Sequence, residues 1–270
     1  MWTSRVLTHT EGNTEASVDF GLIVTQCFTT HYCFGSVRCV LRLITVLDKY
    51  TNLKDMKTSP DKEVRELYED TADSYSKMMD SEIELPIYSD TLSRLAVRIA
   101  ELPGTIIDTS CGSGHMLELY HNNYDSSHSL IGVDLSPKMV EIADKRLGTK
   151  AKTFVGNMLD LGLVSSKSSA AVISFFAIHH LDTEEVILAL REWHRLLVNQ
   201  GQIVLATWEG EGTIDYGDES DVVALKFTQE QIESWVIEAG FVVDRCIVEP
   251  VEEIPMDAIY LEASKLWAHY

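Results

Sequence analysis

The sequence lacks any excess of positive charge. Its 270 residues include 22 Lys and Arg against 42 Asp and Glu, which gives a formal net charge of −20 at pH 7. A chain of this charge would be repelled by a nucleic-acid phosphate backbone and by an anionic membrane surface. We therefore expect neither a nucleic acid nor a membrane among its partners.

Patterned cysteines and long apolar runs are also missing. The five cysteines form no Cys-x-x-Cys pair and no metal-ligand spacing with histidine, which indicates reduced thiols, no bound metal and a cytoplasmic protein. The best candidate for a membrane span, residues 20–47, is interrupted by His31, Arg38 and Arg42. Hydrophobic residues make up 45% of the chain, enough to bury a core of ordinary size.

Charge and periodicity divide the chain at about residue 55. Residues 1–55 hold five Lys or Arg and five Asp or Glu, so the whole negative charge falls on residues 56–270. Residues 1–55 are predicted to be a poorly patterned extension: a helical layer, a targeting segment, or translated sequence upstream of a start at Met56. Residues 56–270 are predicted to form one domain.

Beyond Met56, predicted strands alternate with predicted helices. Apolar runs indicate strands at residues 105–108, 130–134, 153–155, 171–176, 202–207, 241–248 and 258–263. Helical spacing covers residues 61–79 and 89–101, and capping residues begin further helices at Ser136, Asp182 and Thr228. This alternation predicts an α/β protein with a mostly parallel sheet and helices on both faces.

A glycine-rich loop follows the first predicted strand. The sequence DTSCGSGH runs from Asp108 to His115, at the sheet edge where ligands of such folds bind. Leu117 stands where a dinucleotide motif needs its third glycine, and the Asp108 carboxylate would repel a pyrophosphate but attract a cation. Asp134, which ends the second strand, is placed to accept hydrogen bonds from ribose hydroxyls. Both acids favour S-adenosylmethionine, which carries an ammonium and a sulfonium but no phosphate.

Five segments together resemble the class I S-adenosylmethionine-dependent methyltransferases of the small-molecule type. They are IIDTSCGSGH, IGVDLSPKMVEIA, FVGNMLDL, AAVISFFAIHHL and REWHRLLVNQGQIVLATW, and the resemblance covers the chain from about Met56 onward. It implies a Rossmann-like three-layer sandwich with helices on both faces of a seven-stranded, mostly parallel sheet whose last strand runs antiparallel. It also implies S-adenosyl-L-methionine as the cofactor.

The resemblance further implies which residues contact the cofactor. These are Asp108, Ser110, Gly112 and Gly114 around the methionine end, Asp134 at the ribose, Leu135, Met139, Asn157 and Met158 at the adenine, Phe175 near the end of the fourth strand, and Tyr75 on a helix that folds over the site. Two positions depart from the family, because Ser110 replaces a glycine and Asn157 replaces an acid. The amide of Asn157 can still accept from the adenine amino group and donate to a ring nitrogen.

Two histidines mark the expected acceptor side of the site. His179 and His180 follow the fourth strand, and a neutral imidazole can take a proton from an acceptor that arrives protonated. We predict both as catalytic residues, with His180 as the base; a polar entry to the next helix is the alternative. The acidic stretch 208–221 is predicted to be a flexible solvated loop, with a lid for a cationic acceptor as the alternative.

The sequence therefore predicts transfer of a methyl group from S-adenosylmethionine to an O, N or S atom of a small molecule. Two alternatives remain: a weakly active or inactive binding or regulatory protein of the same fold, and a C-methyltransferase of a quinone or lipid-type substrate. The Asn/Asp-Pro-Pro-aromatic motif of adenine N-methylation is replaced by Phe175-Phe176-Ala177-Ile178. The oligomeric state is left open.

Overall fold

The computed structural model describes residues 56–214, 216, 220–251 and 255–266. The chain divides into two units, Met1–Thr51 and Asn52–Tyr270, and every described residue belongs to the second. The predicted extension, residues 1–55, lies outside the described residues. Its boundary at Met56 and its role therefore stay predictions.

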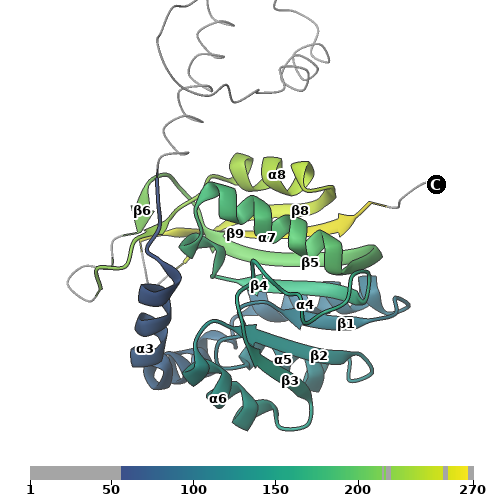
Figure 1. Cartoon of the computed structure of the whole chain (residues 1–270). Coiled ribbons are helices and arrows are strands. Elements are labelled where there is room, and N and C mark those ends of the chain that lie inside the picture. Colours follow the sequence, from purple (N-terminus) through teal and green to yellow (C-terminus); the bar gives the residue numbers. More distant parts are fainter. Residues whose placement is uncertain (1–55, 215, 217–219, 252–254, 267–270) are drawn as a thin grey trace, which may run out of the picture. The chain divides into compact units, whose positions relative to one another are not determined.

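A seven-stranded sheet forms the centre of the second unit (Figure 1). Its order is β3-β2-β1-β4-β5-β9-β8, and β9 pairs antiparallel with both neighbours while β3 to β5 pair in parallel. The strands are β1 Thr105–Asp108, β2 Ser129–Asp134, β3 Ala151–Val155, β4 Ser169–Phe175, β5 Leu197–Trp208, β8 Phe241–Pro250 and β9 Asp257–Lys265. The predicted seven-stranded sheet with an antiparallel last strand is confirmed.

Three of the described α-helices begin where capping residues predict, whereas the other three have no side-chain cap. Ser136 accepts from Met139 N, and both Asp182 and Thr228 form capping boxes with the residue three positions on. The described helices are α3 Asp61–Glu82, α4 Pro86–Ile99, α5 His115–Asn123, α6 Pro137–Leu147, α7 Thr183–Leu196 and α8 Gln229–Glu238, with a short 3₁₀ turn, η1, at Ile178–His180. None of these helices is long and apolar enough to cross a membrane.

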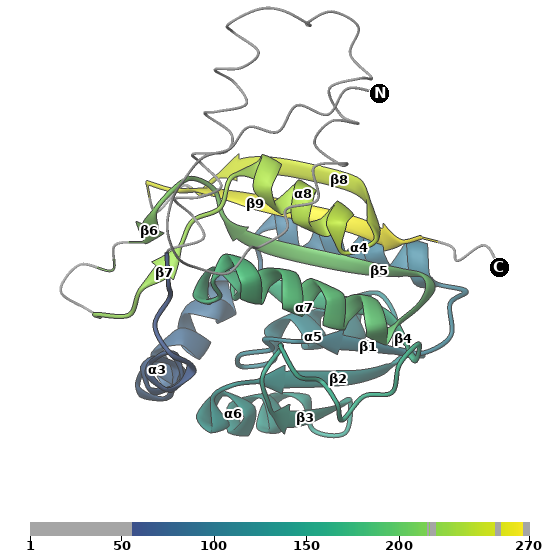
Figure 2. The same cartoon turned by 45° about the horizontal axis from the view of Figure 1, so that its top comes forward.

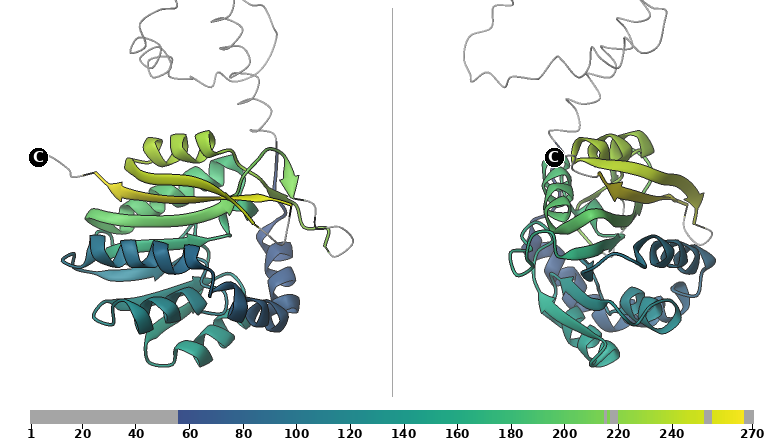
Figure 3. Two further views of the ribbon diagram at one scale, coloured as in Figure 1. Left: turned by 180° about the vertical axis from the view of Figure 1, so that it is seen from behind. Right: turned by 90° about the vertical axis from the view of Figure 1, so that its right-hand side faces the viewer.

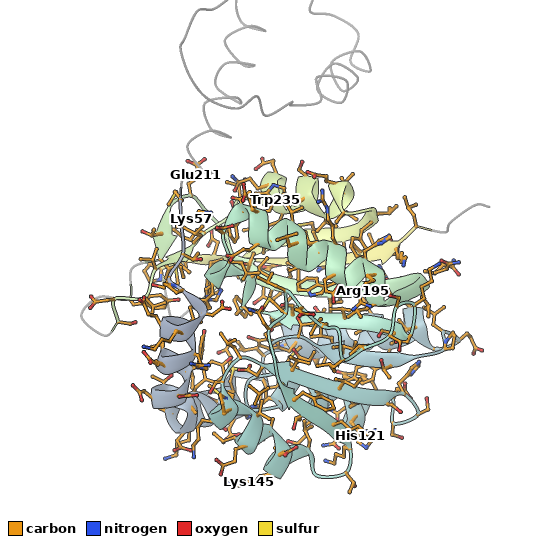
Figure 4. All side chains as sticks on the ribbon, in the orientation of Figure 1. Lys57, His121, Lys145, Arg195, Glu211 and Trp235 are labelled. Carbon is orange, nitrogen blue, oxygen red and sulfur yellow. The ribbon has the colours of Figure 1, made fainter. Side chains whose placement is uncertain are left out.

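Helices lie on both faces of the sheet (Figure 3), and between the helices and the sheet are two apolar cores. Neighbouring strand residues alternate between them: Ile107 and Val172 pack with α7 and α8, whereas Ile106 and Ile173 pack with α4, α5 and α6. Figure 4 labels Lys145 on α6 and Trp235 on α8, at opposite ends of the strand order. The result is the predicted three-layer sandwich, with β4 buried along its whole length.

Helix α3 lies outside these layers, across the carboxyl ends of the strands (Figures 1 and 2). Near it, part of the stretch 208–221 forms β6 (Thr213–Ile214), which pairs antiparallel with β7 (Ala224–Leu225). The prediction of a wholly flexible loop was wrong for β6. Ile214 is buried there with its partner strand, and burial of these apolar side chains holds the segment in place.

Candidate active site

The glycine loop between β1 and α5 turns sharply beneath α3. Gly112 has φ +50° and Gly114 has φ +87°, in the left-handed region that favours glycine. A Cβ on Gly112 would lie 3.3 Å from the ring of Tyr75, and one on Gly114 would lie 3.1 Å from Leu147. The absence of a Cβ at Gly112 thus leaves room for Tyr75 of α3, which covers the loop, whereas Gly114 lets α5 approach α6.

Two strand-end carboxylates flank this loop. Asp108 is 2% exposed, and its Oδ1 accepts from Ser110 N at 3.2 Å. Asp134 accepts from Gly112 N at 2.8 Å and from Ser136 N at 2.9 Å. Burial raises the pKa of Asp108 to about 7, with a further contribution from the charge of Asp134, whose own pKa burial also raises. A cationic ligand would offset the cost of keeping these acids ionised.

Two pockets adjoin at Ser110, which contributes to the walls of both. Including the open space at its mouth, the β1 pocket spans about 400 Å³ and the β2 pocket about 520 Å³. The β1 pocket is lined by Asp108, Ser113 and His115 and by the rings of Tyr75, Tyr88, Phe175 and Phe176. The β2 pocket is lined by Asp61, Asp134, Leu135, Asn157, Met158 and His180. Together they form one cleft beside the glycine loop, with Asp108 in the β1 pocket and Asp134 in the β2 pocket.

Helix α3 roofs both pockets. Tyr75 lies over Gly112 in the β1 pocket, and Asp61, at the first turn of the helix, lines the β2 pocket. At the other end of α3, Asp80 Oδ1 pairs with His115 Nε2 at 2.8 Å and accepts from Arg146 at 2.9 Å. An ion pair also holds the segment that precedes α3.

Lys57, labelled in Figure 4, forms an ion pair with Asp182 at the start of α7, at 2.5 Å. These contacts hold α3 in place over the two pockets.

The histidine pair sits next to the β2 pocket. His180 and His179 are 8% and 3% exposed, and their ring centroids are 4.1 Å apart. His180 Nε2 lies 2.9 Å from the hydroxyl of Tyr68, whose ring also stands edge-on to Tyr75. Burial lowers the pKa of His180 to about 4 and that of His179 well below its usual range. Both rings are therefore neutral at pH 7, because of burial rather than the helix that follows.

The structure gathers most of the predicted site residues. Those that line one of the two pockets are Tyr75, Asp108, Ser110, Asp134, Leu135, Asn157, Met158, Phe175 and His180. Four others do not. Met139 has no exposed surface, the ring of His179 lies next to that of His180, Gly114 packs against α6, and Gly112 faces Tyr75 without lining either pocket. The implied ligand contacts of Met139, Gly112 and Gly114 therefore stay predictions.

Several residues of the site were not predicted. Asp61, Tyr88, His115 and Phe176 line the pockets, and Tyr68 holds His180. Phe176 has φ +49°, a strained conformation for a large side chain and one that often marks a functional site. No group of three or more His, Cys, Asp or Glu in the described part of the chain could hold a metal ion.

Comparison with known proteins supports the resemblance. Residues 106–201, from β1 into β5, match the model of a methyltransferase domain. This match, and the fold shared with solved S-adenosylmethionine-dependent methyltransferases, support a class I S-adenosylmethionine-dependent methyltransferase. This methyltransferase has the fold of a 1,6-didemethyltoxoflavin-N1-methyltransferase from Burkholderia thailandensis, with a TM-score of 0.60 and 17% identity over 78% of this chain and 93% of that one.

Curated relatives match shorter segments. A probable tRNA methyltransferase 9B from Bos taurus is 29% identical over 167 residues, which are 59% of this chain and 32% of that protein. A malonyl-[acyl-carrier protein] O-methyltransferase from Anoxybacillus flavithermus is 38% identical over 61 residues, 23% of each chain. The methyltransferase thus spans about a third of the length of the first relative, and the acceptor does not follow from these names.

The residues of the cleft fit S-adenosylmethionine, the cofactor of this family. Asp108 suits its ammonium, and Asp134 suits its ribose hydroxyls, since a carboxylate that accepts two backbone N–H groups keeps further lone pairs. The missing Cβ of Gly112 leaves the loop close beneath Tyr75. Cys111 is buried, and its Sγ lies against the backbone of the glycine loop. Burial raises the pKa of its thiol, which disfavours a role as nucleophile.

Proposed function

We propose that this methyltransferase transfers the methyl group of S-adenosylmethionine to an oxygen, nitrogen or sulfur atom of a small-molecule acceptor. The observation that supports it most is the pair of strand-end acids, Asp108 and Asp134, at the two pockets that meet at Ser110. When bound, the cofactor supplies an activated methyl group. The chain's own part is to hold the reactants in line and to exclude water beneath α3.

A small acceptor is supported by the covering of the cleft and by the charge of the chain. Residues of α3 line both pockets, so this helix covers part of the cleft. The net charge of −20 opposes binding of a polynucleotide. Aromatic rings of Tyr75, Tyr88, Phe175 and Phe176 line the β1 pocket and suit an acceptor with an apolar body.

A nucleic-acid acceptor is the second candidate. The Bos taurus relative favours a nucleic-acid acceptor, because that protein is described as a probable tRNA methyltransferase. The two candidates differ in what the chain should bind at physiological salt. Small acceptors need only the cleft, whereas tRNA needs a positively charged surface that the composition disfavours.

The test is a screen with methyl-labelled S-adenosylmethionine. Panels of amines, thiols, phenols and carboxylic acids are compared with total tRNA, and release of S-adenosylhomocysteine is measured alongside label transfer. We expect label in a small molecule and none in tRNA. Label in tRNA would replace the small acceptor by the second candidate. Tight cofactor binding without transfer to any acceptor would favour a binding protein of the same fold.

A further inference from the structure

The adenine end of the cofactor needs a hydrogen-bond acceptor in the β2 pocket. An adenine amino group is a donor, so a site that selects it must offer an oxygen with a free lone pair. Asp134 already accepts from Gly112 N and Ser136 N, and its place at the end of β2 suits the ribose. The acceptor for the amino group must come from elsewhere in the pocket wall.

Asn157 does not present its amide freely to the pocket. Its Oδ1 accepts from Leu159 N at 2.9 Å, and its Nδ2 donates to Asp61 Oδ2 at 2.6 Å. Each end of the amide therefore has one protein partner, and Asn157 keeps only one lone pair on a neutral oxygen, a weaker acceptor than a carboxylate. The effect of Asn157 is to hold the Asp61 carboxylate at the wall of the pocket, which Asp61 lines from the first turn of α3.

We propose that Asp61 accepts a hydrogen bond from the exocyclic amino group of the adenine. An ionised carboxylate has about four lone-pair sites, and the contact with Asn157 uses one of them. The strand end after β3 thus carries an amide, and a helix 96 positions earlier in the chain supplies the acid. A charge-assisted bond of this kind discriminates strongly against a base that lacks the amino group.

Because Asp61 belongs to α3, binding of the base would also attach this helix to the ends of the strands. The same helix places Tyr75 over Gly112 and joins Tyr68 to His180. Adenine bound to Asp61 would add one more attachment between α3 and the strand ends. S-adenosylhomocysteine should therefore slow hydrogen exchange in the first turns of α3, and its deamino analogue should do so less.

The experiment compares two ligands on three proteins by calorimetry. The ligands are S-adenosylhomocysteine and its deamino analogue, whose purine carries hydrogen in place of the amino group. The proteins are the full wild-type chain, Asp61→Ala, and the control Glu63→Ala, which removes another exposed acid from the same helix turn. Thermal melts of the unliganded proteins check folding.

We expect the wild type and Glu63→Ala to prefer S-adenosylhomocysteine over the deamino analogue by roughly tenfold or more. In Asp61→Ala this preference should fall to about one, while affinity for the analogue changes little. An unchanged preference in Asp61→Ala, or equal binding of the two ligands by the wild type, would overturn the assignment of Asp61. The inference rests on the proposed cofactor site: if neither ligand bound the wild type, that site and the role of Asp61 would both fail.

Discussion

At the scale of single residues, Asp108 carries the clearest electrostatic strain. It is buried beside a second acid, and its pKa is raised to about 7 from a usual 3.8. A carboxyl group with a raised pKa stabilises the folded protein below the unfolded pKa, and this contribution is lost as the pH rises toward 7. The same carboxyl must be ionised to pair with the ammonium of the cofactor. Stability and binding therefore depend on pH in opposite directions.

Asp108→Asn separates these two effects. We expect the unliganded variant to melt at a higher temperature than the wild type at pH 8, with little difference at pH 4. Calorimetry with S-adenosylhomocysteine should show wild-type affinity falling by up to about tenfold per pH unit below pH 7, and a weaker affinity without this dependence in the variant. A wild-type affinity that is constant between pH 5.5 and 8 would contradict the placement of Asp108.

His180 provides a test on the acceptor side. Its neutral imidazole lies by the β2 pocket and is held by Tyr68. For a protonated acceptor, we expect His180→Asn to lower turnover by about 10² or more, with cofactor affinity unchanged. Because the pKa of His180 is lowered to about 4, turnover with saturating cofactor should not fall near pH 6.5 through protonation of this histidine. A loss of only a few fold would leave His180 as a structural partner of Tyr68, and a thiolate acceptor would need no base.

At the scale of elements, α3 links all parts of the site. Its first turn lines the β2 pocket, its middle covers Gly112 through Tyr75, and its last turns are held by Asp80. Asp80 meets His115 of α5 and Arg146 of α6, and these contacts hold the pKa of Asp80 below its usual range. His115 lines the β1 pocket, but Asp80 itself lines neither pocket, so Asp80 can be changed without removing a residue of the pocket walls.

Asp80→Asn is expected to loosen the roof. Because exposed ion pairs contribute little to stability, the rate of S-adenosylhomocysteine dissociation should rise only about two- to fivefold, measured by stopped-flow displacement. Asp73→Asn is the matched control, because it removes an exposed charge from the same helix. Equal dissociation rates in the wild type and both variants would show that α3 does not limit release of the product.

The elements themselves were largely predictable from local signals. Caps at Ser136, Asp182 and Thr228 and the apolar runs of the strands act within a few residues, so the sequence alone reveals them. Contacts such as Asp61 with Asn157 join residues 96 positions apart, and no local pattern announces them. Met139 shows the reverse: a motif suggests a ligand contact, but the helical spacing of α6 turns its side chain into the core.

At the scale of the whole molecule, the negative charge belongs to residues 56–270, and residues 1–55 are neutral. The site described above is built from residues beyond Met56. We expect a chain that begins at Met56 to melt cooperatively and to bind S-adenosylhomocysteine as tightly as the full chain. Aggregation or a lost cooperative melt would show that the domain needs residues 1–55.

The most direct test of the cofactor site is calorimetric titration of S-adenosylhomocysteine into the wild type and Asp134→Ala. Melts of both unliganded proteins are needed, since Asp134 also holds Gly112 N and Ser136 N. We expect one site per chain in the wild type, roughly tenfold or more weaker binding in a folded Asp134→Ala variant, and no binding of NAD. Equal affinity in the two proteins, or a preference for NAD, would contradict the assignment of the cleft to S-adenosylmethionine.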